Sequence, residues 1–184
     1  MEGGIYLAGH PLGFTTSNFH TPVNDLIYAY PFIMVRTGVL SVLGVRVSNI
    51  TGVAGDIVRL AVYSNLSNTI MFPDALLYDS GDIAAVGPDS DKICAPGLDL
   101  EADHLYWVCV MAHYTSPTGM IIRCAPGTQA WPILGDISGN GGIGYTTPFT
   151  GPDYPDPMTS MSINNEQGVT GLKLLYLTLE SLGP

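Results

Sequence analysis

The fold is decided between residues 28 and 82, where four short apolar or alternating runs follow one another. They read YAYPFIMV (28–35), LGVRV (43–47), VRLAVY (58–63) and ALLYDSGD (75–82). Gly, Asn, Asp or Pro closes each run, a pattern typical of antiparallel strands joined by tight turns. This stretch therefore predicts an all-β protein.

Size and composition agree with this prediction. A chain of 184 residues is the size of one domain, and 46% hydrophobic against 12% charged residues supplies enough apolar material for a core. The 22 glycines and 14 prolines fit many short strands with many corners better than a helix bundle. Disorder along the whole chain is excluded.

The alternation of apolar and polar residues predicts eight strands. They are expected at about 26–35, 39–48, 57–64, 75–86, 92–100, 104–114, 119–125 and 169–180. Ser80, Gly81 and Asp82 are expected to bend or bulge the fourth strand. A helix is an alternative for the last segment, since Leu172, Leu175 and Leu179 share a helix face, but its Thr, Tyr and flanking Gly favour a strand.

Two further segments lack strand periodicity. Residues 1–25 are rich in Gly, Thr, Asn, His and Pro, and they predict an extended N-terminal arm. Residues 126–165 are rich in Gly, Pro, Asp and Thr, and they predict a long surface excursion or an interface. The expected architecture is a single antiparallel two-sheet β-sandwich over 26–184, jelly-roll-like, with this arm and excursion attached.

Charge and targeting signals narrow the function. Six Lys and Arg against sixteen Asp and Glu give a formal net charge of −10, which argues against binding to nucleic acid or to anionic lipid. The start of the chain lacks a signal-peptide pattern, and no apolar run has membrane-spanning length. Cys109 lies in an apolar run and is expected to be buried; Cys94 and Cys124 are able to pair, although reduced thiols are the simpler expectation.

Three alternating carboxylates are the best candidate for an ion site. In a strand, Asp99, Glu101 and Asp103 would share one face, and a cation such as calcium would relieve their repulsion. A solvated loop is the favoured interpretation because no EF-hand spacing is present. Paired acids also leave a glycosidase as an alternative, but no motif singles out a general acid.

Other chemistry-bearing residues form no motif. Serine-nucleophile and phosphate-loop patterns are absent, and the four histidines are scattered. We therefore expect no catalytic residue and no cofactor. Four aromatic residues of the excursion could instead form a glycan-stacking platform or a partner contact, with packing onto the sandwich as the alternative: Trp131, Tyr145, Phe149 and Tyr154.

An ordered set of strand motifs supports a family resemblance. The pieces are YPF (30–32) with Val35, LGVRV (43–47), VRLAVY (58–63), PDALLYDSG (73–81) and LYWV (105–108). Residues 28–125 thereby resemble a β-sandwich module of tailed-bacteriophage fibre, receptor-binding and head-decoration proteins. In that module the pieces occur in this order as successive strands and turns.

The resemblance implies a non-enzymatic attachment or display protein on a virion surface, often a trimer, made in the host cytoplasm. The chain starts at Met1 without a coiled-coil or repetitive shaft. If it is complete, this favours a capsid decoration protein that binds the major capsid or other virion proteins through its arm and excursion. The alternative is a tail-fibre or receptor-binding module that recognises host surface glycans.

Overall fold

A computed structural model describes most of the chain as strands and turns. The described residues are 4–7, 18–34, 37–48, 53–67, 69–87, 89–115, 119–124, 145–163 and 175–180. Within them there are fourteen strands and no helix. The strands are β1 (Gly4–Leu7), β2 (Asn18–His20), β3 (Leu26–Ile33), β4 (Gly38–Val47), β5 (Ile57–Asn65), β6 (Pro73–Asp79), β7 (Ile83–Ala84), β8 (Ser90–Cys94), β9 (Leu98–Leu100), β10 (Leu105–His113), β11 (Ile122–Cys124), β12 (Tyr145–Pro148), β13 (Ser162–Ile163) and β14 (Leu175–Glu180).

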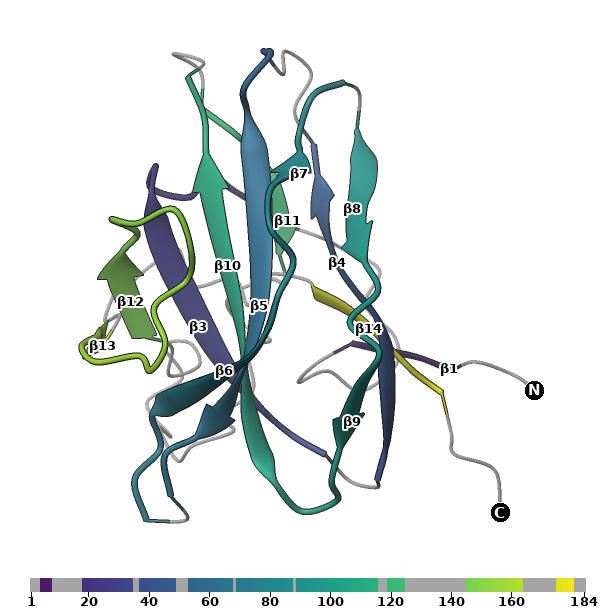
Figure 1. Ribbon diagram of the computed structural model, residues 1–184. Helices are drawn as coiled ribbons and strands as arrows, with labels where there is room; N and C mark the ends of the chain where they lie inside the picture. The colour runs from purple at the N-terminus through teal and green to yellow at the C-terminus, as the bar shows by residue number, and fades with distance from the viewer. Residues whose placement is uncertain are drawn as a thin grey trace.

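The strands form two antiparallel sheets that pack face to face (Figure 1). We call them sheet A and sheet B. Sheet A has the order β1-β14-β4-β11-β2, and β8 and β9 also pair with β4. Sheet B has the order β13-β12-β3-β10-β5-β6, and β7 also pairs with β5. The predicted all-β, two-sheet antiparallel sandwich is therefore confirmed, whereas the jelly-roll detail stays a prediction.

The main core lies between the sheets and follows from strand alternation. On β10, Val108, Val110 and Ala112 face this core together with Leu60 and Val62 of β5. Successive side chains of a strand point to opposite faces, so the residues between them point outward from sheet B. An antiparallel sheet normally leaves that outer face to solvent. In sheet B, however, the outer face is apolar as well.

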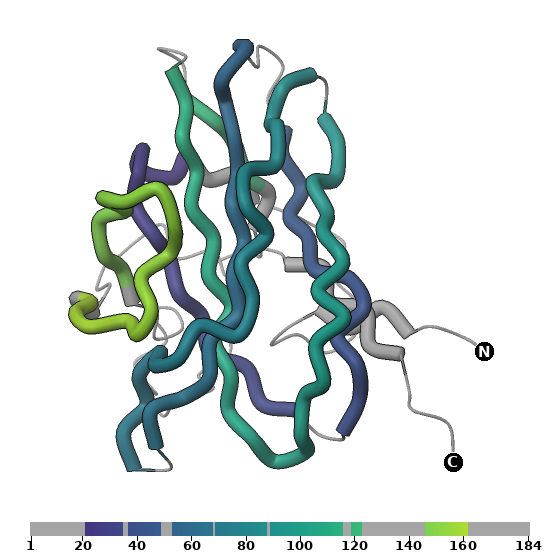
Figure 2. The backbone as a smooth tube through the Cα atoms, in the orientation of Figure 1, coloured from purple at the N-terminus to yellow at the C-terminus, as the bar shows by residue number. Residues whose placement is uncertain are grey.

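A second core covers the outer face of sheet B. It contains Trp107, Cys109 and Met111 of β10, all of them buried. Their cover is residues 145–163, which we call the strap. Its β12 pairs antiparallel with β3, and the rest of it lies beside sheet B in both views of the backbone (Figures 1 and 2). Because both its faces are covered, β10 is buried along almost all of its length.

Most predicted strands have counterparts within one to three residues, and two are divided. The expected strand at 75–86 consists of β6 and β7, separated by Ser80, Gly81 and Asp82 as anticipated. Gly81 has φ 63°, a left-handed conformation that strand residues other than glycine rarely adopt. The expected strand at 92–100 consists of β8 and β9. The closing strand is present as β14, and the remainder of 169–180 lies outside the described residues.

The described parts of the arm belong to sheet A. β1 pairs antiparallel with β14, and β2 pairs with β11, so both ends of the sheet A strand order come from residues 1–25. These two strands hydrogen-bond within the chain's own sheet, and an extended arm over residues 1–25 stays a prediction. The composition of residues 1–25 did not predict these strands, because Gly and Asn are uncommon in strands.

In the part of the chain that is described, no helix is long and apolar enough to cross a membrane.

Candidate functional site: the strap and its buried arginine

Arg59 is the most unusual side chain of the described structure. It lies on β5 between Val58 and Leu60, on the strand face that also carries Ala61 and Tyr63, and it is only 6% exposed. A buried guanidinium is very costly unless every charge and donor has a partner. The arrangement of its partners therefore determines what this site can do.

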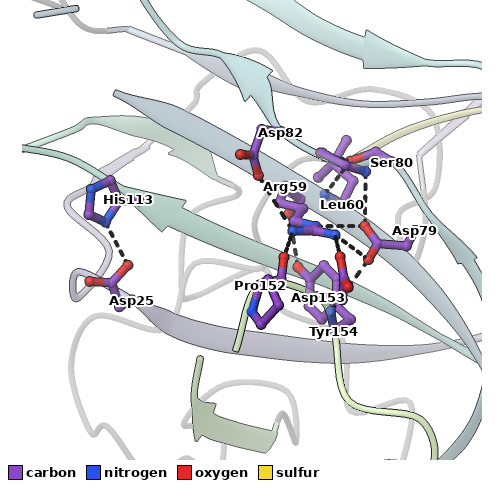
Figure 3. A network of polar contacts seen from close by, with 11 residues as sticks. Asp25, Arg59, Leu60, Asp79, Ser80, Asp82, His113, Pro152, Asp153 and Tyr154 are labelled. Carbon is purple, nitrogen blue, oxygen red and sulfur yellow. Dashed lines mark hydrogen bonds and ion pairs between the residues drawn. The ribbon is translucent and has the colours of Figure 1, made fainter. Parts of the chain in front are cut away.

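Three carboxylates from two directions surround the guanidinium (Figure 3). Asp79, at the end of β6, binds it at two points, Nε–Oδ1 and Nη2–Oδ2, each at 2.7 Å. Asp153 of the strap accepts from Nη2 at 2.8 Å, and Asp82 lies 3.5 Å from Nη1. The Pro152 carbonyl also accepts from Nη1. Each side-chain nitrogen of Arg59 thus has an acceptor within the protein, so the guanidinium chiefly joins segments of its own chain.

The strap is attached by further hydrogen bonds that reach across the sheet. Tyr154 donates its hydroxyl to the backbone carbonyl of Arg59 at 2.9 Å, and Tyr63 donates its hydroxyl to the Pro155 carbonyl at 2.7 Å. Four backbone amides add to the set: Phe149 N to Asp25 O, Met158 N to Asp74 O, Leu76 N to Asp156 Oδ1 and Tyr154 N to Asp79 Oδ2. The site is therefore a clamp that holds one segment of the chain on another.

Aromatic rings surround the clamp. The Arg59 guanidinium lies 5.7 Å from the Phe149 ring centre and 5.9 Å from that of Tyr154. Tyr154 also makes edge contacts with Phe149 and Tyr63, at centroid distances of 5.6 and 6.3 Å. Cation–π contacts of this kind gain strength when water is excluded. They bind the apolar and ionic parts of the clamp into one unit.

The ionic partners stabilise each other's charged forms. Hydrogen bonds from Arg59 to Asp79 and Asp153 raise the pKa of Arg59 well above its ordinary value, although burial opposes them. Burial by itself would raise the pKa of Asp79, but hydrogen bonds from Arg59 and from the Gly81 amide, with the charge of Arg59, outweigh it and lower that pKa. Both groups are charged at neutral pH.

Two other groups between the strap and sheet B, one on each side, are held in their neutral forms. Burial raises the pKa of the Tyr154 hydroxyl and of the Cys109 thiol. A thiol kept protonated in an apolar site is a poor nucleophile and a poor metal ligand. Cys109 thus behaves as the small buried hydrophobe that was expected.

A histidine–aspartate pair lies on the same face, beyond the clamp (Figure 3). His113 Nδ1 lies 2.8 Å from Asp25 Oδ1, and both side chains are about two-fifths exposed. This resembles the base and orienting acid of a hydrolase triad. Among the described residues, however, no serine, threonine or cysteine side chain hydrogen-bonds His113. The pair connects the turn before β3 to the end of β10.

The candidate ion site is not assembled. Asp99 lies on β9 and is exposed, whereas Glu101 and Asp103 belong to the turn that follows, where Asp103 has φ 60°. This left-handed turn breaks the alternation that would have placed the three carboxylates on one face. Glu101 instead lies 3.6 Å from His104. No group of three or more His, Cys, Asp or Glu that could hold a metal occurs in the described part of the chain.

The four candidate aromatic residues have different positions. Trp131 lies outside the described residues, and of Tyr145 only the backbone in β12 is described. Phe149 is half-buried over Arg59, and Tyr154 is 3% exposed, with its side chain on the side of the strap that faces sheet B. The ring of Tyr154 packs on the sandwich and is not available as a stacking platform. Contact of Trp131 and Tyr145 with a glycan or a partner stays a prediction.

Sequence reasoning did not identify the clamp, although one signal was present. Arg59 interrupts an otherwise apolar strand, VRLAVY, and a charge at a buried strand position requires an opposite charge nearby. The sequence could not indicate which of sixteen acids supplies it.

The Cys94 thiol is free. It lies 3.5 Å from the Leu43 carbonyl oxygen, so it forms no disulfide with Cys124.

Comparisons with known protein families and with curated proteins find no match for this chain.

Proposed function

We propose that this chain is a bacteriophage virion structural protein that decorates the capsid surface without catalysing a reaction. The observation that carries the proposal is the use of its charged groups. In the described structure, the buried Arg59 and its carboxylates hold the chain's own strap, and Arg46 pairs with Asp89 and Asp91. This use of charged groups to hold the chain's own segments supports a structural role for the described part of the protein.

The loop between β5 and β6 is the best-formed contact surface for a capsid partner. Leu66, Ile70 and Met71 are 44–54% exposed there. The side chain of Asn65 organises this loop, since it bonds the Ile70 carbonyl and the Phe72 amide and also accepts from the Trp107 indole at 2.9 Å. A preorganised loop loses little entropy when it docks. Exposed apolar groups on such a loop are typical of a protein contact.

The arm and the strap are the other contacts that the proposal assigns to the capsid. β1 and β2 stand at the two ends of sheet A, and an edge strand is able to pair with a strand of a neighbouring protein. The outward side of the strap carries exposed residues such as Pro152 and Pro157. We propose a trimer, in which like subunits around a capsid axis make the same contacts.

Locating the chain in purified particles tests the proposal. Quantitative mass spectrometry and electron microscopy should find many copies spread over the head. A few copies confined to the tail would contradict decoration and would favour the receptor-binding alternative, which binding to host surface glycans would then test. Absence of the chain from particles would exclude both.

Docking to capsids that lack this protein tests the surface. Leu66→Ser combined with Ile70→Ser should weaken binding about tenfold or more, because two apolar anchors are lost. Ile93→Ser is the matched control, since Ile93 is 58% exposed but lies on β8 of the other sheet. Equal binding by the two variants would show that the loop is not part of the contact.

A further inference from the structure

The strap and the sandwich differ greatly in how much core holds them. The strap contributes two buried apolar residues, Tyr154 and Met158, to the outer core. The core between the sheets draws on both sheets and contains eighteen buried residues. Segments with few buried apolar contacts open at lower free energy than the core of the same domain. The strap is therefore the part of the described structure whose attachment depends most on polar contacts.

The ionic contacts among them converge on one cation, the Arg59 guanidinium. The charged groups that face Arg59 are Asp79 at the end of β6, Asp82 after it, and Asp153 of the strap itself. The neighbouring titratable groups are Tyr63 on the same strand, Tyr154 of the strap and Cys109 on β10, all neutral because they are buried. No second cation takes part among the described residues. Protonation of the carboxylates would leave a buried, unpaired guanidinium.

The carboxylates also join the two halves of the clamp. Asp79 accepts from Arg59 and from the backbone amide of Tyr154 at 3.4 Å, so it contacts both the sheet and the strap. Asp153 lies on the strap and accepts a hydrogen bond from Arg59 on the sheet. When these carboxylates lose their charge, the strap loses its central ion pairs, and only its aromatic contacts and its backbone bonds at either end oppose detachment.

We propose that the strap is an acid-released cover: on acidification, residues 145–163 detach from the outer face of sheet B while the two-sheet sandwich stays folded. Detachment uncovers the apolar row of β10, including Trp107 and Cys109, and the edge of β3 that β12 occupies. Arg59 then becomes solvated, which removes the cost of its unpaired charge. This inference does not depend on the proposed function in a virion.

Cysteine accessibility provides a direct test, because Cys109 lies under the strap and its neighbour Val108 lies between the sheets. One chain keeps Cys109 as its only thiol, with Cys94→Ser and Cys124→Ser. The control chain carries the same two changes together with Cys109→Ala and Val108→Cys. Both are treated with 2,2′-dithiodipyridine, a thiol reagent that reacts in acid, from pH 7 to pH 2.5. Circular dichroism monitors the sheet structure throughout.

The expected result is a selective rise in the reactivity of Cys109. As the pH falls below about 4, the ordinary aspartate pKa, toward the lowered pKa of Asp79, labelling of Cys109 should become about 100-fold faster than that of the Val108→Cys thiol, with the sheet spectrum unchanged. Asp79→Asn should produce the same rise at pH 7. Asp91→Asn, which alters the exposed pair with Arg46, should not. Equal labelling of the two positions at every pH would overturn the proposal.

Hydrogen exchange of the unmodified chain keeps the test decisive if Asp79→Asn does not fold. The amides of Phe149, Tyr154 and Met158 belong to the strap, and those of β10 belong to the sandwich. Strap amides should lose protection in acid before the β10 amides do. Simultaneous loss of protection in both sets would show that the strap opens only when the whole domain unfolds, and would also overturn the proposal.

Discussion

The hydrogen bond between the Tyr154 side chain and the Arg59 backbone has its donor on the strap, whereas the ion pair beside it has its donor on the sheet. The Tyr154 hydroxyl of the strap donates to the Arg59 carbonyl at 2.9 Å, while the Arg59 guanidinium donates to Asp153 of the strap at 2.8 Å. Each segment therefore supplies both donors and acceptors to the other. A shift of the strap by one residue would break all of these contacts together, which gives the clamp its specificity.

The hydroxyl and the ring of Tyr154 should make separable contributions to stability. Tyr154→Phe removes one buried hydrogen bond and should lower the free energy of unfolding by about 1 kcal/mol. Tyr154→Ala also removes the ring packed against Tyr63 and Phe149, at a cost of about 3–5 kcal/mol. Urea denaturation of the three proteins measures both steps. Similar losses for Phe and Ala would mean that the ring packing contributes little.

Arg59 should matter far more than the other paired arginine of the described structure. Arg59→Met leaves Asp79 beside a buried neutral side chain, and the expected loss is about 3–5 kcal/mol. Arg59→Lys should recover only part of this loss, because an ammonium group cannot bind Asp79 at two points. Urea denaturation at pH 7 checks the ranking.

Arg46→Met is the control for this comparison. Its partners Asp89 and Asp91 are exposed on the surface, and surface ion pairs contribute little to stability. We expect almost no change in the midpoint of unfolding. A loss for Arg46→Met as large as that for Arg59→Met would contradict the role assigned to burial.

The sequence predicted the strands well because each strand is a short apolar or alternating run closed by turn residues. β5 and β10 were located within one or two residues, and the break at Gly81 was anticipated from the Ser-Gly-Asp turn. β12 was missed because Pro148 and its neighbours read as a loop. Its strand conformation comes from pairing with β3, more than one hundred residues earlier in the chain.

The clamp could not be predicted for the same physical reason. Arg59 meets Asp79 across a sequence separation of 20 residues and Asp153 across 94. Strand periodicity reports which face a residue occupies, but it carries no information on which loop covers that face. Apolar residues on both faces of VRLAVY and LYWVCVM did indicate that something covers the outside of the sheet.

Stability should fall at alkaline pH, partly because of Tyr78. Burial, with a hydrogen bond to Cys94, raises the pKa of Tyr78 to about 12. The unfolded chain ionises this hydroxyl near its ordinary value of about 10, so the contribution of Tyr78 is complete below pH 10 and is lost as the pH rises toward 12. Urea denaturation from pH 9 to 11.5 should show a smaller decline for Tyr78→Phe. A decline identical to that of the unmodified chain would mean that Tyr78 is as solvated when folded as when unfolded.

Gly44 is required by the close approach of two strands of sheet A. A Cβ atom built on Gly44 would lie 2.7 Å from Ile93 Cγ2 and 3.0 Å from the Lys92 carbonyl oxygen on β8. The isoleucine side chain is able to rotate away, but the carbonyl is held in the β4–β8 ladder, where Gly44 pairs with Ile93. Gly44→Ala should therefore destabilise the protein by about 1–3 kcal/mol.

A second substitution separates the two causes of this loss. In an Ile93→Ala background, Gly44→Ala should cost less, because only the backbone contact remains; full recovery would assign the entire effect to Ile93. Gly151→Ala is the matched control, since its Cβ would meet nothing closer than the Asp153 carbonyl at 3.5 Å, an ordinary contact. Thermal unfolding of the four variants beside the unmodified protein, with Gly151→Ala close to the unmodified protein, distinguishes a steric effect from a general effect of replacing glycine.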